Sequence, residues 1–139
     1  MASNDINSMP GTQTLRVQLP VAMASATTDD EYPGIVAPCN LTVKAARFVP
    51  LAAVTANASN FTTLSVRNRK ADASGTALPA SRSWAATNST AFVADSCALS
   101  GTASDLLVNS GDVLTVQRIH SGTGVVIPAG TVEIDYTVR

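Results

Sequence analysis

The residue types that most often carry out catalysis are scarce in this sequence. The single histidine among its 139 residues, His120, ends a strand-like run and could act as a general base or a metal ligand. No second histidine can complete a metal site with it, and no Ser/His/Asp arrangement surrounds it. His120 is therefore predicted to be an ordinary polar residue beside a turn. The sequence predicts no catalytic residue, metal site, cofactor or enzymatic activity, although carboxylates distant in sequence could still meet in the fold.

Three consecutive acidic residues, Asp29, Asp30 and Glu31, could bind a hard cation such as calcium. They lack the alternating ligands and the glycine of a dedicated calcium loop. The run is instead predicted to be a solvated loop that ends at Tyr32, a residue type suited to contacts with a partner. We therefore expect Asp29, Asp30, Glu31 and Tyr32 to contact a partner, together with Met9 near the N-terminus.

Three further segments have the composition of a binding site without its context. The loop at residues 121–124 is rich in glycine, but no lysine follows and no helix begins there, so it is predicted to be a hairpin loop. The basic residues at 67–70 follow a strand-like run and are predicted to be the charged end of a hairpin. The single tryptophan, Trp84, could stack on a sugar ring.

The composition is compatible with a surface that contacts other protein subunits. Charged residues make up 14% of the sequence, compared with about 25% in typical domains. Neutral polar surface is cheaper to desolvate than charged surface, so such a face can pack against a subunit, although an undirected drift in composition would look the same. The 9 basic and 10 acidic residues form no dense basic patch, so we expect no nucleic-acid partner.

The sequence also bears on location and redox state. The first residues lack the features of a signal peptide and no apolar run approaches the length of a membrane span, so we expect synthesis in the cytoplasm and no membrane partner. Cys39 and Cys97 lie far apart in the sequence and are expected to be buried free thiols.

Alternation of apolar and polar residues with a period of two runs through most of the chain. Leu15, Val17, Leu19 and Val21 are the first example, and Pro20 places this strand at an edge or near its end. Further strands are expected at residues 34–37, 41–50, 61–66, 91–99, 113–119 and 131–138, with weaker strand signals at 76–86 and 106–108. Turns are expected at Pro33-Gly34 and at residues 109–112. No stretch has a sustained helical period. The pattern predicts an all-β fold, an antiparallel β-sandwich or jelly-roll-like barrel of about eight or nine short strands.

The organisation along the chain is simple. Residues 1–12 are polar and contain Met9-Pro10-Gly11, so they are predicted to form a flexible or partner-ordered N-terminal arm. Residues 13–139 show no internal repeat and no second composition regime. They are therefore predicted to form a single β-sandwich domain.

Five segments combine turns and strands in a particular arrangement, namely residues 33–43, 45–50, 61–69, 109–116 and 122–132. In this arrangement the chain resembles a family of small β-sandwich proteins from the heads of tailed bacteriophages, the capsid decoration or head cement proteins. The resemblance covers residues 33 to 138, with a poor match over 70–105, and the N-terminal arm lies outside it. Its motifs are turns and strands rather than catalytic residues, so no catalytic residue is carried over.

The resemblance implies a role at the exterior of a virion. Proteins of this family bind the outside of a capsid shell, often as homotrimers, and stabilise the shell by bridging neighbouring major capsid subunits. It therefore implies the major capsid protein as partner, with synthesis in the host cytoplasm. Many weak sites on a symmetric lattice can add up to firm attachment when the copies form a trimer.

A second interpretation fits the same fold. A β-sandwich can serve as a receptor- or glycan-binding module, such as a fibre tip or an adhesin, with its specificity in the loops at one end. Sugar binding through Trp84 would favour this alternative.

Overall fold

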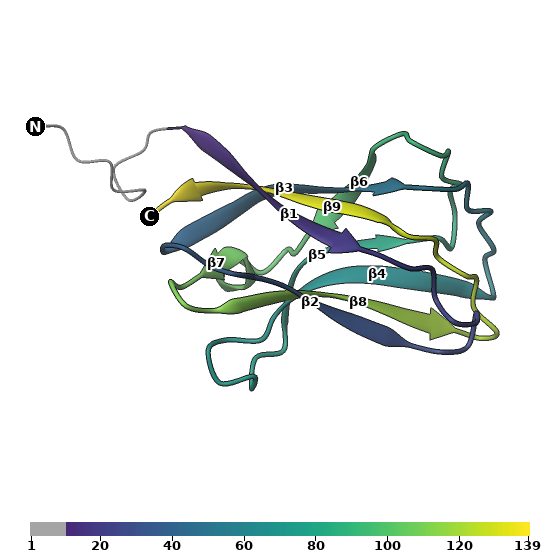
Figure 1. Cartoon of the computed structure of the whole chain (residues 1–139), viewed down its shortest axis with the longest axis horizontal. Helices are drawn as coiled ribbons and strands as arrows, with labels where there is room; N and C mark the ends of the chain where they lie inside the picture. The colour runs from purple at the N-terminus through teal and green to yellow at the C-terminus, as the bar shows by residue number, and fades with distance from the viewer. Residues whose placement is uncertain (1–10) are drawn as a thin grey trace, which may run out of the picture.

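The computed structural model describes residues 11–139, which form an almost entirely β-stranded body (Figure 1). A short 3-10 helix, η2 (Ala103–Leu106), precedes the shortest strand. The nine strands of the described residues are β1 (Thr12–Leu19), β2 (Asp30–Val36), β3 (Leu41–Pro50), β4 (Phe61–Asn68), β5 (Ala77–Ser83), β6 (Asp95–Leu99), β7 (Leu107–Val108), β8 (Val113–Ser121) and β9 (Gly130–Val138). The all-β fold expected from the period-two alternation is confirmed.

The strands form one antiparallel, nearly closed sheet. Their order is β1-β9-β3-β6-β5-β4-β8-β2, with β7 paired to β3. The sheet folds into two facing layers, β1, β9 and β3 in one and β5, β4, β8 and β2 in the other (Figure 1). Strand β6 joins the layers, because Asp95–Cys97 pair with β3 whereas Ala98 and Leu99 pair with β5.

The two terminal strands of this order, β1 and β2, lie against each other without pairing, so the barrel is nearly closed. Gly34 makes the close approach possible, because a Cβ atom there would lie 2.7 Å from Cγ2 of Val17. Pro33, beside it, lacks an N–H to offer to a further strand, which protects the edge from unwanted pairing. The same residues shift the register between β2 and β8 by one position.

The core lies between the two layers and follows the predicted alternation. Leu15, Val17 and Leu19 of β1 are buried, and so are alternate residues of β3, β4, β8 and β9. Near one end of the core, Phe48 meets the fully buried Trp84 edge to face, with ring centroids 5.8 Å apart. Aromatic pairs in this geometry add about 0.5–1.5 kcal/mol beyond their burial.

The structure corrects the sequence prediction in the acidic region. Asp30, Glu31 and Tyr32 belong to strand β2 and not to a solvated loop, and Pro33-Gly34 lies within that strand and not in a turn. Positively charged residues of other segments neutralise the two carboxylates, so the strand tolerates them. Strand β1 begins at Thr12, the last residue of the expected arm, whereas Met9 lies outside the described residues.

The antiparallel order places the connections at two ends of the body (Figure 1). One end, here called the loop end, carries residues 20–29, 51–60, 84–94 and 122–129, at the right of Figure 1. The other, the termini end, carries Gly11, Arg139 and residues 37–40, 69–76 and 109–112, at the left.

Candidate functional site

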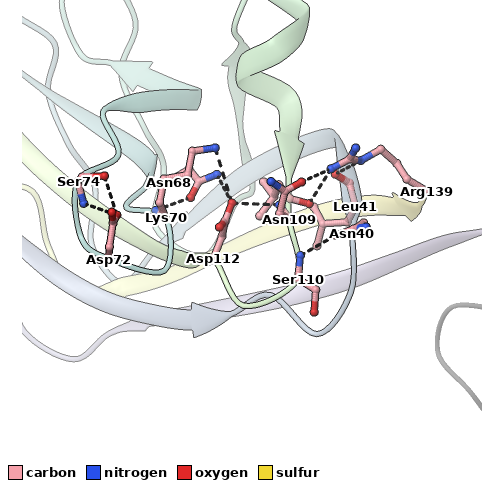
Figure 2. Close-up of polar contacts among 11 residues, drawn as sticks. Asn40, Leu41, Asn68, Lys70, Asp72, Ser74, Asn109, Ser110, Asp112 and Arg139 are labelled. Atoms are coloured by element: carbon pink, nitrogen blue, oxygen red, sulfur yellow. Dashed lines mark hydrogen bonds and ion pairs between the residues drawn. The ribbon is translucent and has the colours of Figure 1, made fainter.

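The termini end is closed by a buried polar network centred on Asp112 (Figure 2). Its carboxylate accepts hydrogen bonds of 3.0 Å from Nδ2 of Asn68 and from the backbone N–H of Asn109. The ammonium group of Lys70 lies 3.7 Å from the same carboxylate. Asn68, itself fully buried, accepts a hydrogen bond from the backbone N–H of Lys70. These bonds fix the predicted turn at residues 109–112 against the end of β4.

Arg139 extends this network to strand β9 (Figure 2). Its guanidinium group donates to the carbonyl oxygens of Leu41 and Val108 and to the side chain of Asn109. The side chain of Asn40 accepts from the backbone N–H of Ser110, 2.8 Å away. Most of the polar side chains drawn in Figure 2 thus bond to one another or to the backbone, as expected for groups that close a barrel.

The basic residues at 67–70 are bound internally. Arg67 donates to the carbonyl oxygen of Gly75, and Arg69 binds both carboxylate oxygens of Glu31. Strand β4 ends at Asn68 and pairs with β5, so the expectation that this run ends a hairpin is confirmed. The absence of a nucleic-acid partner stays a prediction.

At the loop end the interior holds a fully buried arginine, Arg118 of β8. Both oxygens of Asp30 accept hydrogen bonds from its guanidinium group, at 2.8 and 2.6 Å. The same group donates to the backbone carbonyls of Val21 and Ile127 and lies 5.4 Å from the centre of the Tyr32 ring. Asp30 and Tyr32, predicted to contact a partner, therefore hold Arg118 in place, and the arginine ties together two loops of this end.

The other two acidic residues of the cluster point elsewhere. Asp29 accepts a hydrogen bond from the backbone N–H of His120 and lies 2.6 Å from its Nδ1 atom, and these contacts lower the pKa of Asp29. Glu31 binds Arg69 and Thr115, and the hydrogen bond from Arg69 lowers its pKa most. His120 is the last but one residue of strand β8 and lies beside a turn, as predicted. No group of three or more candidate metal ligands gathers within residues 11–139.

The remaining candidates from the sequence are buried. Trp84 is fully enclosed and its Nε1 donates to Oγ of Ser89 at 2.6 Å, so it cannot stack on a sugar ring. Cys39 and Cys97 are both buried, as expected from the sequence, and they form no disulfide with each other. Desolvation raises the pKa of Cys97 to about 12, so this thiol stays protonated and unreactive at neutral pH.

The outer face of the layer containing β1, β9 and β3 carries an ion-pair network. Arg47 binds Glu133 at 2.9 Å and Asp135 at 2.8 Å, and Arg16 binds Glu133 at 3.1 Å. These partners lower the pKa of both carboxyl groups. The charges of this face are therefore largely neutralised within the chain itself.

The loop end exposes an apolar surface that the sequence interpretation missed. The side chain of Phe92 is 73% exposed, and Leu51 is 58% exposed. Both line a groove of about 290 Å³ whose walls are Gln18, Leu19, Pro20, Val49, Pro50, Leu51, Phe92, Ala129, Gly130 and Thr131. None of these described residues is charged. The large apolar residues Val21, Val93 and Val126 are also exposed in loops of this end.

Phe92 is held in an unusual backbone conformation. Its φ angle is +62°, a left-handed value that costs residues other than glycine about 1–2 kcal/mol. A hydrogen bond of 2.9 Å from its N–H to the carbonyl of Pro50 holds it beside the groove. The sequence assigned this residue to a strand from residue 91, but β6 begins at Asp95. The sequence feature that could have indicated an exposed apolar loop here is the apolar run from Ala91 to Ala94 between two polar segments.

Comparisons with known proteins leave the chain without an established family. No family model matches the sequence and no curated protein matches it. Among solved structures, the chain is similar to part of one described as "Structure of infectious bursal disease virus Gx strain", with a TM-score of 0.35 and 10% sequence identity. The match covers 90% of this chain and 32% of that chain, so this chain spans about a third of its length. A likeness at this score carries no argument about function. No helix within residues 11–139 is long and apolar enough to cross a bilayer.

Proposed function

We propose that this chain is a non-catalytic structural protein of a virion, which binds the outside of the capsid shell as a homotrimer and bridges neighbouring major capsid subunits. The observation that carries the proposal is the exposed apolar surface around Phe92 and Leu51. The resemblance of residues 33–138 to phage decoration proteins supports the choice of a capsid as the partner. The receptor-binding alternative loses its main argument, because Trp84 is buried.

The apolar surface has the properties of a docking site. Exposing Phe92 to water in a strained backbone conformation does not stabilise the isolated chain, whereas covering it with a partner would recover the burial of a large aromatic side chain. Because the groove beside it carries no charged residue among those described, its complement is an uncharged apolar face. We infer that the complementary surface is the outer face of the major capsid protein.

The rest of the molecule supports attachment through the loop end. The predicted contact residues Asp30 and Glu31 are occupied by arginines of the same chain, so we place the main contact at Leu51 and Phe92 instead. The termini end points away from such a contact (Figure 1). A closed barrel changes little on binding, which limits the entropic cost of association. Three copies with their loop ends facing the shell would gain from multivalency.

The test combines solution mass with attachment to shells. A mass near three times 14.3 kDa by light scattering is expected, followed by co-sedimentation with capsid shells stripped of this protein. Phe92→Asn should weaken attachment at least tenfold, since it removes the exposed ring. Asparagine tolerates the left-handed conformation, so the same change should raise the free energy of unfolding, by about 0.5–1 kcal/mol.

The matched control is Leu78→Asn, which removes an exposed apolar side chain from strand β5, away from the groove. It should leave attachment unchanged. Absence of the protein from purified virions would overturn the proposal. A copy number as low as that of a fibre tip would favour the receptor-binding alternative.

A further inference from the structure

A second cleft opens where strands β5 and β6 separate. The two strands pair at Ala80 with Leu99 and at Ser81 with Ala98. Beyond this point β6 leaves β5 and pairs with β3, from Cys97 back to Asp95. The divergence leaves a cleft of about 450 Å³, which is within the usual size range of small-ligand sites.

The walls of this cleft are rich in hydroxyl and amide groups. They include the side chains of Ser81, Ser83, Thr87, Asn88 and Ser96. A hydroxyl group can both donate and accept a hydrogen bond, and an amide side chain offers both functions in fixed positions. Such a lining suits a ligand that itself carries several hydroxyl groups.

The floor of the cleft holds one positive and one negative group, Arg82 and Asp95, whose side chains are only 11% and 17% exposed. Their closest atoms, Nε and Oδ2, are 3.9 Å apart, too far for a hydrogen bond. A guanidinium group has five N–H donors, and the hydrogen bonds of Arg82 to the carbonyls of Ser83 and Thr87 use two of them. Donor capacity therefore remains next to a carboxylate.

Contacts with Trp84 and Ser89 fix the positions of both charged groups. The guanidinium group of Arg82 lies over the Trp84 ring, 4.9 Å from its centroid. Asp95 accepts a hydrogen bond from the hydroxyl of Ser89, which in turn accepts one from Nε1 of Trp84. Because the indole can only donate, this chain of bonds directs the Ser89 proton toward Asp95. The cleft is therefore preorganised, which reduces the cost of binding.

We propose that this cleft binds a neutral saccharide, with adjacent hydroxyl groups of one sugar ring donating to Asp95 and accepting from Arg82. The two opposite charges cancel, so a ligand without net charge fits better than an anion or a cation. No exposed aromatic ring is among the lining residues, so stacking adds nothing and the expected affinity is weak, with a Kd of about 1 mM or higher. This activity goes beyond capsid binding and does not depend on it.

The test is a titration of the full chain followed by the backbone amide signals in NMR spectra. The probes are the methyl glycosides of glucose, galactose, mannose and N-acetylglucosamine, each raised to about ten times the expected Kd, with glucuronate as an anionic probe. At least one neutral glycoside should shift the signals of Ser83, Asn88 and Ser96 in a saturable way, while the signal of Gly111 at the termini end stays in place.

Two variants, together with one control variant, test the location of the binding site and the role of Asp95. Ala98→Trp fills the cleft from an exposed position and should abolish the shifts, whereas Ala103→Trp on η2 is the matched control and should leave them unchanged. Asp95→Asn keeps an acceptor for Ser89 but removes the charge, and should weaken binding about tenfold. The proposal would be overturned by localised shifts with glucuronate alone, by no localised shift with any probe, or by undiminished binding to Ala98→Trp.

Discussion

At both ends of the barrel, the backbone groups of the connecting loops need hydrogen-bond partners, and the two ends supply these partners differently. At the termini end, the buried carboxylate of Asp112 and the guanidinium group of Arg139 bind the turns, and polar groups occupy that end. At the loop end, Arg118 reaches the loop carbonyls from inside the barrel. The loops that carry Leu51 and Phe92 are held by backbone hydrogen bonds, from the N–H of Leu51 to Ala129 and from the N–H of Phe92 to Pro50. Because these bonds use backbone groups only, the side chains of Phe92 and Leu51 can remain apolar and exposed.

The largest effect is expected from breaking the support at the loop end. Arg118→Met removes the guanidinium group and leaves Asp30 without its partner, and the loop carbonyls lose a donor. Breaking one side of a buried ion pair costs about 3–5 kcal/mol, which should appear as a lower free energy of unfolding in urea. The double change Arg118→Met with Asp30→Leu should recover part of the loss, because no unpaired charge remains.

The control for this experiment is Arg16→Met, which breaks an exposed ion pair with Glu133. Such pairs contribute about 0–1 kcal/mol. If Arg118→Met were no more destabilising than Arg16→Met, the loop end would not depend on its internal arginine and the contrast between the two ends would fail.

A smaller effect is expected at the termini end. Asp112→Ala leaves the buried Nδ2 of Asn68 and the N–H of Asn109 without an acceptor, which should cost about 2–3 kcal/mol. Hydrogen exchange should increase in residues 109–112 and at the end of β4, while the loop end stays protected. The matched change Asp72→Ala removes an exposed carboxylate that bonds within its own turn, to Ser74, and should leave the free energy of unfolding close to that of the parent.

The smallest expected effect is a change in the pKa of one aspartate at each end, because the cause of the pKa shift differs between the two ends. Asp29 at the loop end and Asp72 at the termini end both have a pKa below the usual value of an aspartate. The backbone N–H of His120 is the main cause for Asp29, whereas the side-chain hydroxyl of Ser74 is the main cause for Asp72. In an NMR titration, His120→Ala should therefore leave the largest contribution to the shift of Asp29 in place, whereas Ser74→Ala should remove the largest contribution to that of Asp72.

The sign of the accompanying pH dependence is fixed by these directions. A carboxyl group whose pKa is lower in the folded state stabilises the protein above its unfolded pKa, and that contribution is lost as the pH falls through the folded value. Glu31, Glu133 and Asp135 share this direction. Stability should therefore decrease as the pH falls below about 4. Unchanged thermal unfolding between pH 5 and pH 2.5 would contradict this assignment.

Local pattern was enough to predict most of the fold. The alternation at residues 41–50 and 131–138, and the turn at 109–112, correspond to β3, β9 and the loop before β8. The acidic region was interpreted wrongly as a loop because its neutralising partners are distant: Asp30 is 88 residues from Arg118. No local pattern contains that information.

The candidate sites were harder to predict than the fold. The cleft beside Arg82 exists because β6 changes its pairing partner between Cys97 and Ala98, and a five-residue strand carries no sequence mark of such a change. The exposure of Phe92 depends on a left-handed backbone angle that phenylalanine rarely adopts. Sequence reasoning assigns such a residue to the core of a strand, which is the more common outcome.

The pairing of β1 with β9 also determines when the barrel can form. Thr14 and Asp135 are 121 residues apart in the sequence yet hydrogen-bond across the two strands. During synthesis, β1 therefore has no strand to pair with until β9 has been made. Closing so long a loop slows folding and prolongs the exposure of an apolar strand face to other chains. Accumulation of the folded protein should therefore be limited by aggregation of the growing chain, most of all when it is made rapidly and in many copies.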